Sequence, residues 1–151
     1  MYAISVILLL AVIPVGSIAL EASLSGGNLW ALTGKWYVFW AAGVRLFLAG
    51  VMQVLRPQFT AQGIFEIKDT AAFGIVREVG FGNLSMGALG IATLLKPEWL
   101  VPAAIVSGLY YGLAAAGHLG RGERNAKEQL ALWTDILAFA VLAAFVVTQV
   151  L

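Results

Sequence analysis

The residues best suited to chemistry are charged side chains inside otherwise apolar stretches. Arg45, Arg77, Glu78 and Asp135 interrupt segments that are apolar enough to lie in a bilayer. An ionised side chain at that depth destabilises the protein by several kcal/mol unless a partner compensates its charge. We therefore expect these four residues to contact one another or to line a polar site.

The positions of these charges in the predicted helices indicate where they meet. At a rise of about 1.5 Å per residue, Glu78 and Asp135 lie roughly 8 Å inside one membrane boundary, and Arg77 and Gln53 lie at a similar depth. Arg45 is near the midplane, but its long side chain can lean toward the same boundary. The sequence thus predicts an ion pair between Arg45 and either Glu78 or Asp135.

Neutral polar side chains extend this cluster. Tyr111 and His118 share one face of a predicted helix, and Asn83 lies among apolar residues, so that it must form hydrogen bonds across helices. The predicted cluster, which holds either ion pairs or a ligand, consists of Arg45, Gln53, Arg77, Glu78, Asn83, Tyr111, His118 and Asp135. A structural ion-pair network is favoured over the alternative, a site for a polar head group or a proton path.

Several chemistries are excluded by residue type. The chain has no cysteine and one histidine, which excludes thiolate catalysis, iron–sulfur centres and a pair of histidine ligands to haem. No lysine lies within a predicted membrane span, so a retinal Schiff base has no anchor. We expect no metal site, no required cofactor and no catalytic residue in this chain alone.

The composition is that of an integral membrane protein. Of 151 residues, 61% are hydrophobic and 11% are charged, and the mean hydropathy is +0.91. A soluble domain has about twice this share of charged residues. The net charge of +1 provides no basic field to attract nucleic acid, so the expected partner is the lipid bilayer.

Five stretches reach the roughly 20 residues that a helix needs to cross the hydrocarbon layer. They lie near residues 2–24, 35–56, 72–95, 99–119 and 130–151. Pro14 is expected to kink the first helix, and the short Lys96-Pro97-Glu98 link should join the third and fourth helices as a hairpin. Residues 57–71 mix apolar and charged side chains, as an interfacial segment does. The predicted fold is a single all-α membrane domain with five transmembrane helices.

Basic residues predict the orientation of these helices. The connections at 56–71 and 120–129 hold Arg56, Lys68, Arg121, Arg124 and Lys127, whereas the opposite connections hold only Lys35 and Lys96. Connections rich in Lys and Arg usually remain in the cytoplasm. We therefore expect a multi-pass protein of a bacterial-type inner (plasma) membrane, with a cytoplasmic N-terminus and an external C-terminus.

Small residues recur every four positions in the predicted fourth helix. Ala104, Gly108, Gly112 and Ala116 form a stripe that allows a neighbouring helix to approach closely. Packing within the chain is the favoured interpretation, and the seam of a homo-oligomer is the alternative.

From Trp36 onward, the chain carries a series of short motifs: Arg45-Leu46-Phe47-Leu48-Ala49-Gly50, Arg56-Pro57, Arg77-Glu78 before a glycine-rich span, the Lys96-Pro97 hairpin and Gly117-His118. In these motifs the chain resembles the DoxX-like group of small four-span membrane proteins. The resemblance implies a four-helix bundle, to which this chain adds an N-terminal span. It also implies association with redox complexes.

Two functions remain compatible with the sequence. The favoured one is a small noncatalytic membrane subunit or scaffold, which packs through small-residue faces with a redox complex, another membrane protein or a second copy. The alternative is a binder or carrier of an amphiphile, a quinone or a lipid, that uses the polar cluster. Only the alternative requires a cavity beside the cluster.

Overall fold

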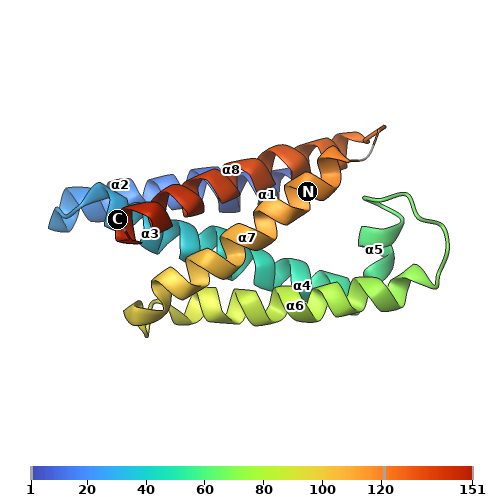
Figure 1. Ribbon diagram of the computed structural model, residues 1–151, viewed down its shortest axis with the longest axis horizontal. Helices are drawn as coiled ribbons and strands as arrows, with labels where there is room; N and C mark the ends of the chain where they lie inside the picture. Colours follow the sequence, from blue (N-terminus) through green and yellow to red (C-terminus); the bar gives the residue numbers. More distant parts are fainter. Residues whose placement is uncertain (1, 121, 151) are drawn as a thin grey trace.

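The computed structural model describes residues 2–120 and 122–150, and within these ranges the chain is helical with no strand (Figure 1). Four helices are long and apolar enough to cross a membrane: Tyr2–Ser25, Leu29–Leu55, Pro97–Leu119 and Ala126–Gln149. This agrees with a multi-pass membrane protein. Arg121, which was predicted to lie in a cytoplasmic connection, and both end residues of the chain are outside the described ranges.

The first long helix contains a wide turn directly before its proline. It consists of α1 (Tyr2–Ile7), the π-helical turn η1 (Leu8–Val12) and α2 (Ile13–Ser25). Pro14 lacks a backbone N–H, and its ring crowds the carbonyl group four residues earlier. The wide turn of η1 is the kind of local change that accommodates this crowding. The distortion thus lies where the sequence predicted a kink.

The second long helix begins earlier than predicted. It consists of α3 (Leu29–Tyr37), the π-helical η2 (Val38–Arg45) and α4 (Leu46–Leu55). The prediction began at residue 35, but the side chain of Asn28 caps the helix by accepting hydrogen bonds from the backbone N–H groups of Trp30 and Ala31, at 2.8 and 3.3 Å. Such a cap satisfies donors that the first helical turn leaves unpaired.

The segment after the second long helix starts with the short helix α5 (Pro57–Ala61) and continues as a loop to α6 (Ala72–Ala92). A tight turn with the 3₁₀ helix η3 (Pro97–Trp99) then leads into α7 (Leu100–Leu119), as the predicted hairpin requires. The last helix, α8 (Ala126–Val150), starts four residues before the predicted boundary. Its cap is Asn125, whose side-chain oxygen accepts hydrogen bonds from the N–H groups of Lys127 and Glu128.

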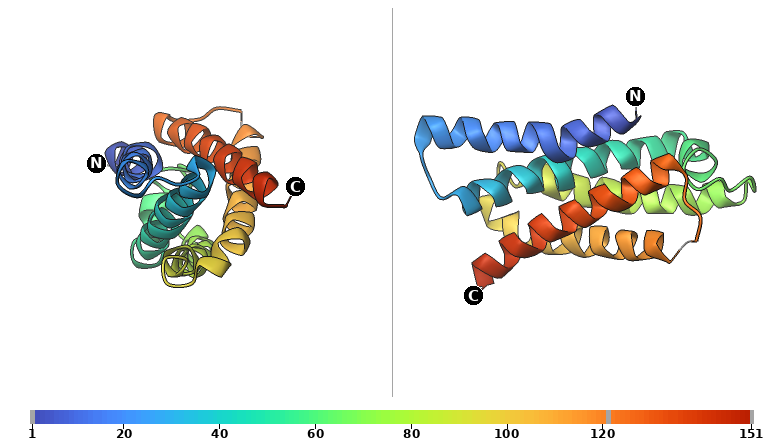
Figure 2. Two further views of the ribbon diagram at one scale, coloured as in Figure 1. Left: turned by 90° about the vertical axis from the view of Figure 1, so that its left-hand side faces the viewer. Right: turned by 90° about the horizontal axis from the view of Figure 1, so that it is seen from above.

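The helices form two closely packed pairs, and the first helix lies against them (Figures 1 and 2). α6 packs along η2 and α4, whereas α7 packs mainly on α8. In the first helix, α2 contacts α3 and η2, η1 contacts η2, and α1 contacts α8. The connections around residues 56–71 and 122–125 lie at one end of the bundle, and those around 26–28 and 93–99 lie at the other (Figures 1 and 2). α6 is 21 residues long but is not among the four most apolar helices.

Glycines allow α6 to approach the second long helix closely. An added Cβ at Gly90 would lie 2.6 Å from the backbone nitrogen of Gly43, and one at Gly50 would lie 2.7 Å from the carbonyl oxygen of Gly80. Distances this short are incompatible with a side chain at either position. The glycine-rich sequence of α6 therefore serves close backbone packing, and the helix is unbroken over its length.

The small-residue stripe of α7 packs within the chain along part of its length. An added Cβ at Gly108 would lie 3.4 Å from Cβ of Leu142, and one at Gly112 would meet the ring of Phe139; both partners are on α8. Ala104 is buried, but Ala116 is exposed. Packing within the chain therefore accounts for the stripe from Ala104 to Gly112, and the prediction for Ala116 stays open.

Candidate functional site

A buried ion pair joins the second and last long helices. Nη2 of Arg45 lies 3.3 Å from Oδ1 of Asp135, and the two side chains are only 14% and 8% exposed. This is one of the two pairings that the sequence predicted for Arg45. Arg45 is the last residue of the π-helical η2, and such local widening of a helix is frequent at functional sites.

Tyr111 contacts the second terminal nitrogen of the Arg45 guanidinium, the one that does not face Asp135. Nη1 of Arg45 donates a hydrogen bond of 2.9 Å to the Tyr111 hydroxyl, which in turn donates to the carbonyl oxygen of Ala41 within η2. The Tyr111 side chain is fully buried. The hydroxyl thus connects α7 to the widened turn of η2 and fixes the position of Arg45.

His118 lies between two acidic side chains. Its Nδ1 is 3.2 Å from Oε1 of Glu128, and its Nε2 is 3.9 Å from Oδ2 of Asp135. The ring of Phe65 stacks on the imidazole, with centroids 5.7 Å apart and planes inclined by 10°. A polar chain therefore runs from Tyr111 through Arg45, Asp135 and His118 to Glu128, and it contains both residues of the α7 face that the sequence singled out.

Glu128 is a member of this chain that the sequence interpretation missed. Glu128 precedes the last predicted span, which begins at residue 130, yet it is only 2% exposed. Glu128 and Asp135 are seven residues apart, which is two helical turns, so they share one face of α8. The apolar residues of that face are also buried, namely Ala131, Leu132, Ala138, Leu142 and Phe145. This periodicity was the signal that could have placed Glu128 inside.

Gln53 and Asn83 form a second polar pair. Nδ2 of Asn83 donates a hydrogen bond of 2.8 Å to Oε1 of Gln53, which joins α6 to α4. Asn83 is 2% exposed, and its Oδ1 is buried without a hydrogen-bond partner in the described part of the chain. The predicted bridge across helices is therefore present, and it leaves one acceptor unsatisfied.

The structure does not bring Arg77 and Glu78 into the cluster. Both residues are exposed on the surface of α6. The face of α6 that packs inward is defined by Val76, Gly80, Asn83, Gly87 and Gly90, and Arg77 and Glu78 project away from it because successive helical residues turn by about 100°. The predicted four-charge cluster is therefore wrong for Arg77 and Glu78, and Arg45 and Asp135 lie instead with His118 and Glu128.

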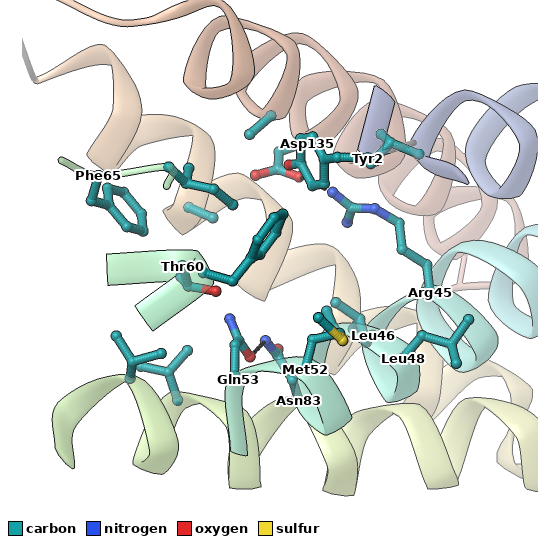
Figure 3. Close-up of a pocket in the computed structure, with 18 of the residues that line it drawn as sticks. Tyr2, Arg45, Leu46, Leu48, Met52, Gln53, Thr60, Phe65, Asn83 and Asp135 are labelled. Atoms are coloured by element: carbon teal, nitrogen blue, oxygen red, sulfur yellow. Dashed lines mark hydrogen bonds and ion pairs between the residues drawn. The ribbon is translucent and has the colours of Figure 1, made fainter. Parts of the chain in front are cut away.

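A cavity of about 580 Å³ lies between the polar chain and the Gln53–Asn83 pair (Figure 3). Arg45, Asp135 and His118 line one wall, and Gln53, Asn83 and Thr60 line another. The remainder of the lining is predominantly apolar and includes Leu48, Met52, Ile75 and Val79, which are 39–68% exposed. The cavity is therefore bounded by polar groups inside and opens between apolar side chains on the outer surface.

Residues 59–67 cover one end of this cavity. Phe59, Ile64, Phe65 and Ile67 contribute to its lining. Asn125 and Lys127 hold the backbone of this segment. Nδ2 of Asn125 donates to the carbonyl oxygen of Ile64 at 2.7 Å, and Nζ of Lys127 donates to the carbonyl oxygen of Gly63 at 3.1 Å. The predicted interfacial segment is thus part of the cavity wall.

The described residues contain no group of three or more His, Cys, Asp or Glu side chains arranged to hold a metal ion. The cavity lining instead offers hydrogen-bond donors from Arg45 and Gln53 and an acceptor from Asp135. Such an arrangement is suited to holding the polar part of an organic ligand.

Residues 1–150 match DUF6790, a family of unknown function, and the chain belongs to this family. No curated protein and no solved structure matches the chain. The match includes no link to the DoxX-like group, so that resemblance and the redox association it implies stay predictions.

Proposed function

We propose that this DUF6790 protein binds a membrane amphiphile, a quinone or a lipid, in the cavity beside Arg45 and Asp135. The polar part of the ligand would contact the inner wall, and its hydrocarbon part would extend toward the bilayer. The proposed role is binding or carriage and involves no catalytic step by this chain.

The observation that carries the proposal is the cavity itself. Its volume of about 580 Å³ is within the range of small-molecule sites, about 300–1,000 Å³. Such sites combine mainly apolar walls with a few convergent polar groups, and this cavity has that combination. An ion-pair network that served only to fasten helices would need no space beside it.

The exposed side of the cavity supports an amphiphile rather than a water-soluble ligand. Ile75 is 68% exposed and Leu48 is 50% exposed, although both are large apolar residues of the cavity lining. In a bilayer these side chains would face acyl chains. A ligand could therefore enter sideways from the lipid and keep its tail there.

The proposed setting is a bilayer that α6 crosses as a fifth helix. α6 has 21 residues, about the length needed to cross the hydrocarbon layer, and it lies alongside the other long helices. The excess of basic residues in the connections near the cavity supports a cytoplasmic location for that end and for the N-terminus, in a bacterial-type plasma membrane.

The scaffold or subunit function stays a prediction. Its main motivation was the stripe through Gly108 and Gly112, and these glycines contact α8 of the same chain. A homo-oligomer or a redox-complex subunit would therefore have to use another face. The cavity makes ligand binding the better supported function.

A cavity-filling substitution tests the proposal. Ala114 lines the cavity, so Ala114→Phe should fill part of it and reduce the amount of lipid or quinone that native mass spectrometry detects on the purified protein. The neighbouring Leu113 is 72% exposed and lies outside the lining, and Leu113→Phe is the matched control. Equal ligand occupancy in the parent and both variants would contradict the proposal.

A further inference from the structure

We infer that the ligand's head group is uncharged and is held at two opposite edges, by the Arg45–Asp135 wall and by the Gln53–Asn83 wall. This inference rests on the proposed function and specifies the chemical class of its ligand. It follows from the charges that line the cavity and from the hydrogen-bonding atoms on its two sides.

The charges lining the cavity leave no excess for an ionic head group. Arg45 and Asp135, both of which line the cavity, are paired with each other at 3.3 Å. His118 also lines the cavity, and its ring nitrogens face the carboxylates of Glu128 and Asp135 at 3.2 and 3.9 Å. An anionic head group near Arg45 would also approach the carboxylate of Asp135, and a cationic head group would approach the guanidinium. Because a buried charge needs a compensating partner, this wall favours a neutral group that accepts from Arg45 or donates to Asp135.

The opposite wall offers hydrogen bonds without charge. In Figure 3 the Gln53 and Asn83 side chains lie across the cavity from Arg45 and Asp135, and the terminal amide of Gln53 is directed toward the space between them. Gln53 uses Oε1 to accept from Asn83, so its N–H groups remain as donors. The buried Oδ1 of Asn83 has no partner in the described part of the chain. The hydroxyl of Thr60 lines the same side.

A matching head group has oxygen atoms at opposite edges and no net charge. A quinone ring and a glycerol ester share this chemistry, and both carry a hydrocarbon tail that could lie between Leu48 and Ile75 at the open side. Carbonyl or hydroxyl oxygens would accept from Arg45 at one edge and from Gln53 at the other. A hydroxyl could also donate to Asp135.

The test compares probes that differ in head-group charge. Monoolein and 1-oleoyl lysophosphatidate share an acyl chain and a glycerol unit, but only the second carries a phosphate; decylubiquinone supplies a neutral ring. We expect native mass spectrometry of the full-length protein in detergent to give at least tenfold tighter binding of monoolein or decylubiquinone than of lysophosphatidate. The stronger of the two neutral probes identifies the type of head group.

Substitution of the second wall provides the control. Gln53→Met keeps the length of the side chain but removes the hydrogen-bonding amide. It should lower the affinity for the preferred neutral probe about tenfold, which corresponds to about 1.4 kcal/mol of binding free energy. Gln58 is exposed and lies outside the lining, and Gln58→Met should leave binding unchanged.

The outcomes separate this inference from the proposed function. If lysophosphatidate binds as tightly as the neutral probes or more tightly, the inference of an uncharged head group is wrong, although the protein still binds an amphiphile. Unchanged affinity of a folded Gln53→Met variant for the neutral probe would show that the head group is not held at the Gln53 edge. The comparison of neutral and charged probes uses the parent protein and does not depend on that variant. If none of the three probes binds the parent more tightly than it binds Ala114→Phe, that result would instead contradict the proposed function.

Discussion

Arg45 and Asp135 are 90 residues apart in the sequence, yet their side chains form an ion pair of 3.3 Å inside the helical bundle. The pair connects the end of the widened turn η2 to the buried face of α8. It also forms one wall of the cavity, so the same two residues contribute to stability and to the proposed binding site.

The first prediction concerns the energetic coupling of this pair. Arg45→Leu leaves the buried Asp135 carboxylate without its cationic partner, and loss of one partner of a buried pair costs about 3–5 kcal/mol. Arg45→Leu combined with Asp135→Asn should recover part of that loss, because the unpaired charge is gone. Thermal unfolding in detergent of the parent, both single variants and the double variant measures the coupling. Strictly additive effects would show that the pair is energetically irrelevant.

The second prediction concerns the close contact of α6 with the second long helix. Gly90→Ala places a methyl group 2.6 Å from the backbone nitrogen of Gly43, and the helices must separate. We expect a loss of about 1–3 kcal/mol in the free energy of unfolding, as in other overpacked interfaces.

Gly82 provides the matched control on the same helix. No atom lies within 4 Å of a Cβ added there, so Gly82→Ala should be neutral or should stabilise α6 by up to about 1 kcal/mol through helix propensity. Equal unfolding temperatures for Gly82→Ala and Gly90→Ala would argue against the close contact. At Gly112, where the neighbour is the movable ring of Phe139, alanine should be milder than leucine.

The third prediction separates two roles of Asn125. Its oxygen caps α8, and its nitrogen donates to the backbone of Ile64. Asn125→Asp keeps the cap but removes the donor to Ile64 and places a carboxylate beside that of Glu66, to which Asn125 Nδ2 also donates at 3.1 Å. Hydrogen exchange should therefore accelerate in residues 62–68 while overall stability changes little. Asn125→Ala removes both functions and should also cost about 1 kcal/mol from the lost cap. Unchanged exchange in Asn125→Asp would mean that the hydrogen bond does not hold the segment.

The fourth prediction concerns the buried contact of Glu128 with His118. Glu128→Gln retains an oxygen that can accept from Nδ1, whereas Glu128→Leu leaves this ring nitrogen without that partner. Loss of a buried hydrogen-bond partner costs about 1–3 kcal/mol, so the leucine variant should unfold at a lower temperature than the glutamine variant.

The imidazole ¹⁵N signals provide a direct readout of this contact, because the chain has one histidine and they need no assignment. They should shift more in Glu128→Leu than in Glu128→Gln. Identical signals in the two variants would place the histidine in an environment independent of Glu128.

The fifth prediction is topological. The chain has no cysteine, so single cysteines at Ser25 and Glu123 can be labelled selectively in intact cells. Both positions are exposed; Ser25 ends α2, Glu123 lies between α7 and α8, and the two are at opposite ends of the bundle (Figure 1). We expect Ser25→Cys to react with an impermeant reagent from outside and Glu123→Cys to react only after lysis. The reverse pattern would overturn the orientation predicted from the basic residues.

Much of the fold could be predicted from the sequence because long apolar stretches have few alternatives in lipid. The stretches that became the four apolar helices were all identified, and the hairpin at Lys96-Pro97-Glu98 followed from its shortness. The errors at residues 29 and 126 arose at helix starts, where the side chains of Asn28 and Asn125 extend each helix beyond its apolar run.

The sequence by itself determined which residue types would need partners, and it predicted that Arg45 pairs with Glu78 or Asp135 because an ionised group in an apolar span must be compensated. Only the tertiary structure decided which charges are buried, since this depends on how each helix is rotated about its axis. That rotation exposes Arg77 and Glu78 and buries Glu128 beside His118. The cavity likewise exists only through packing, because its walls come from helices distant in sequence and no local pattern specifies the space that remains between them.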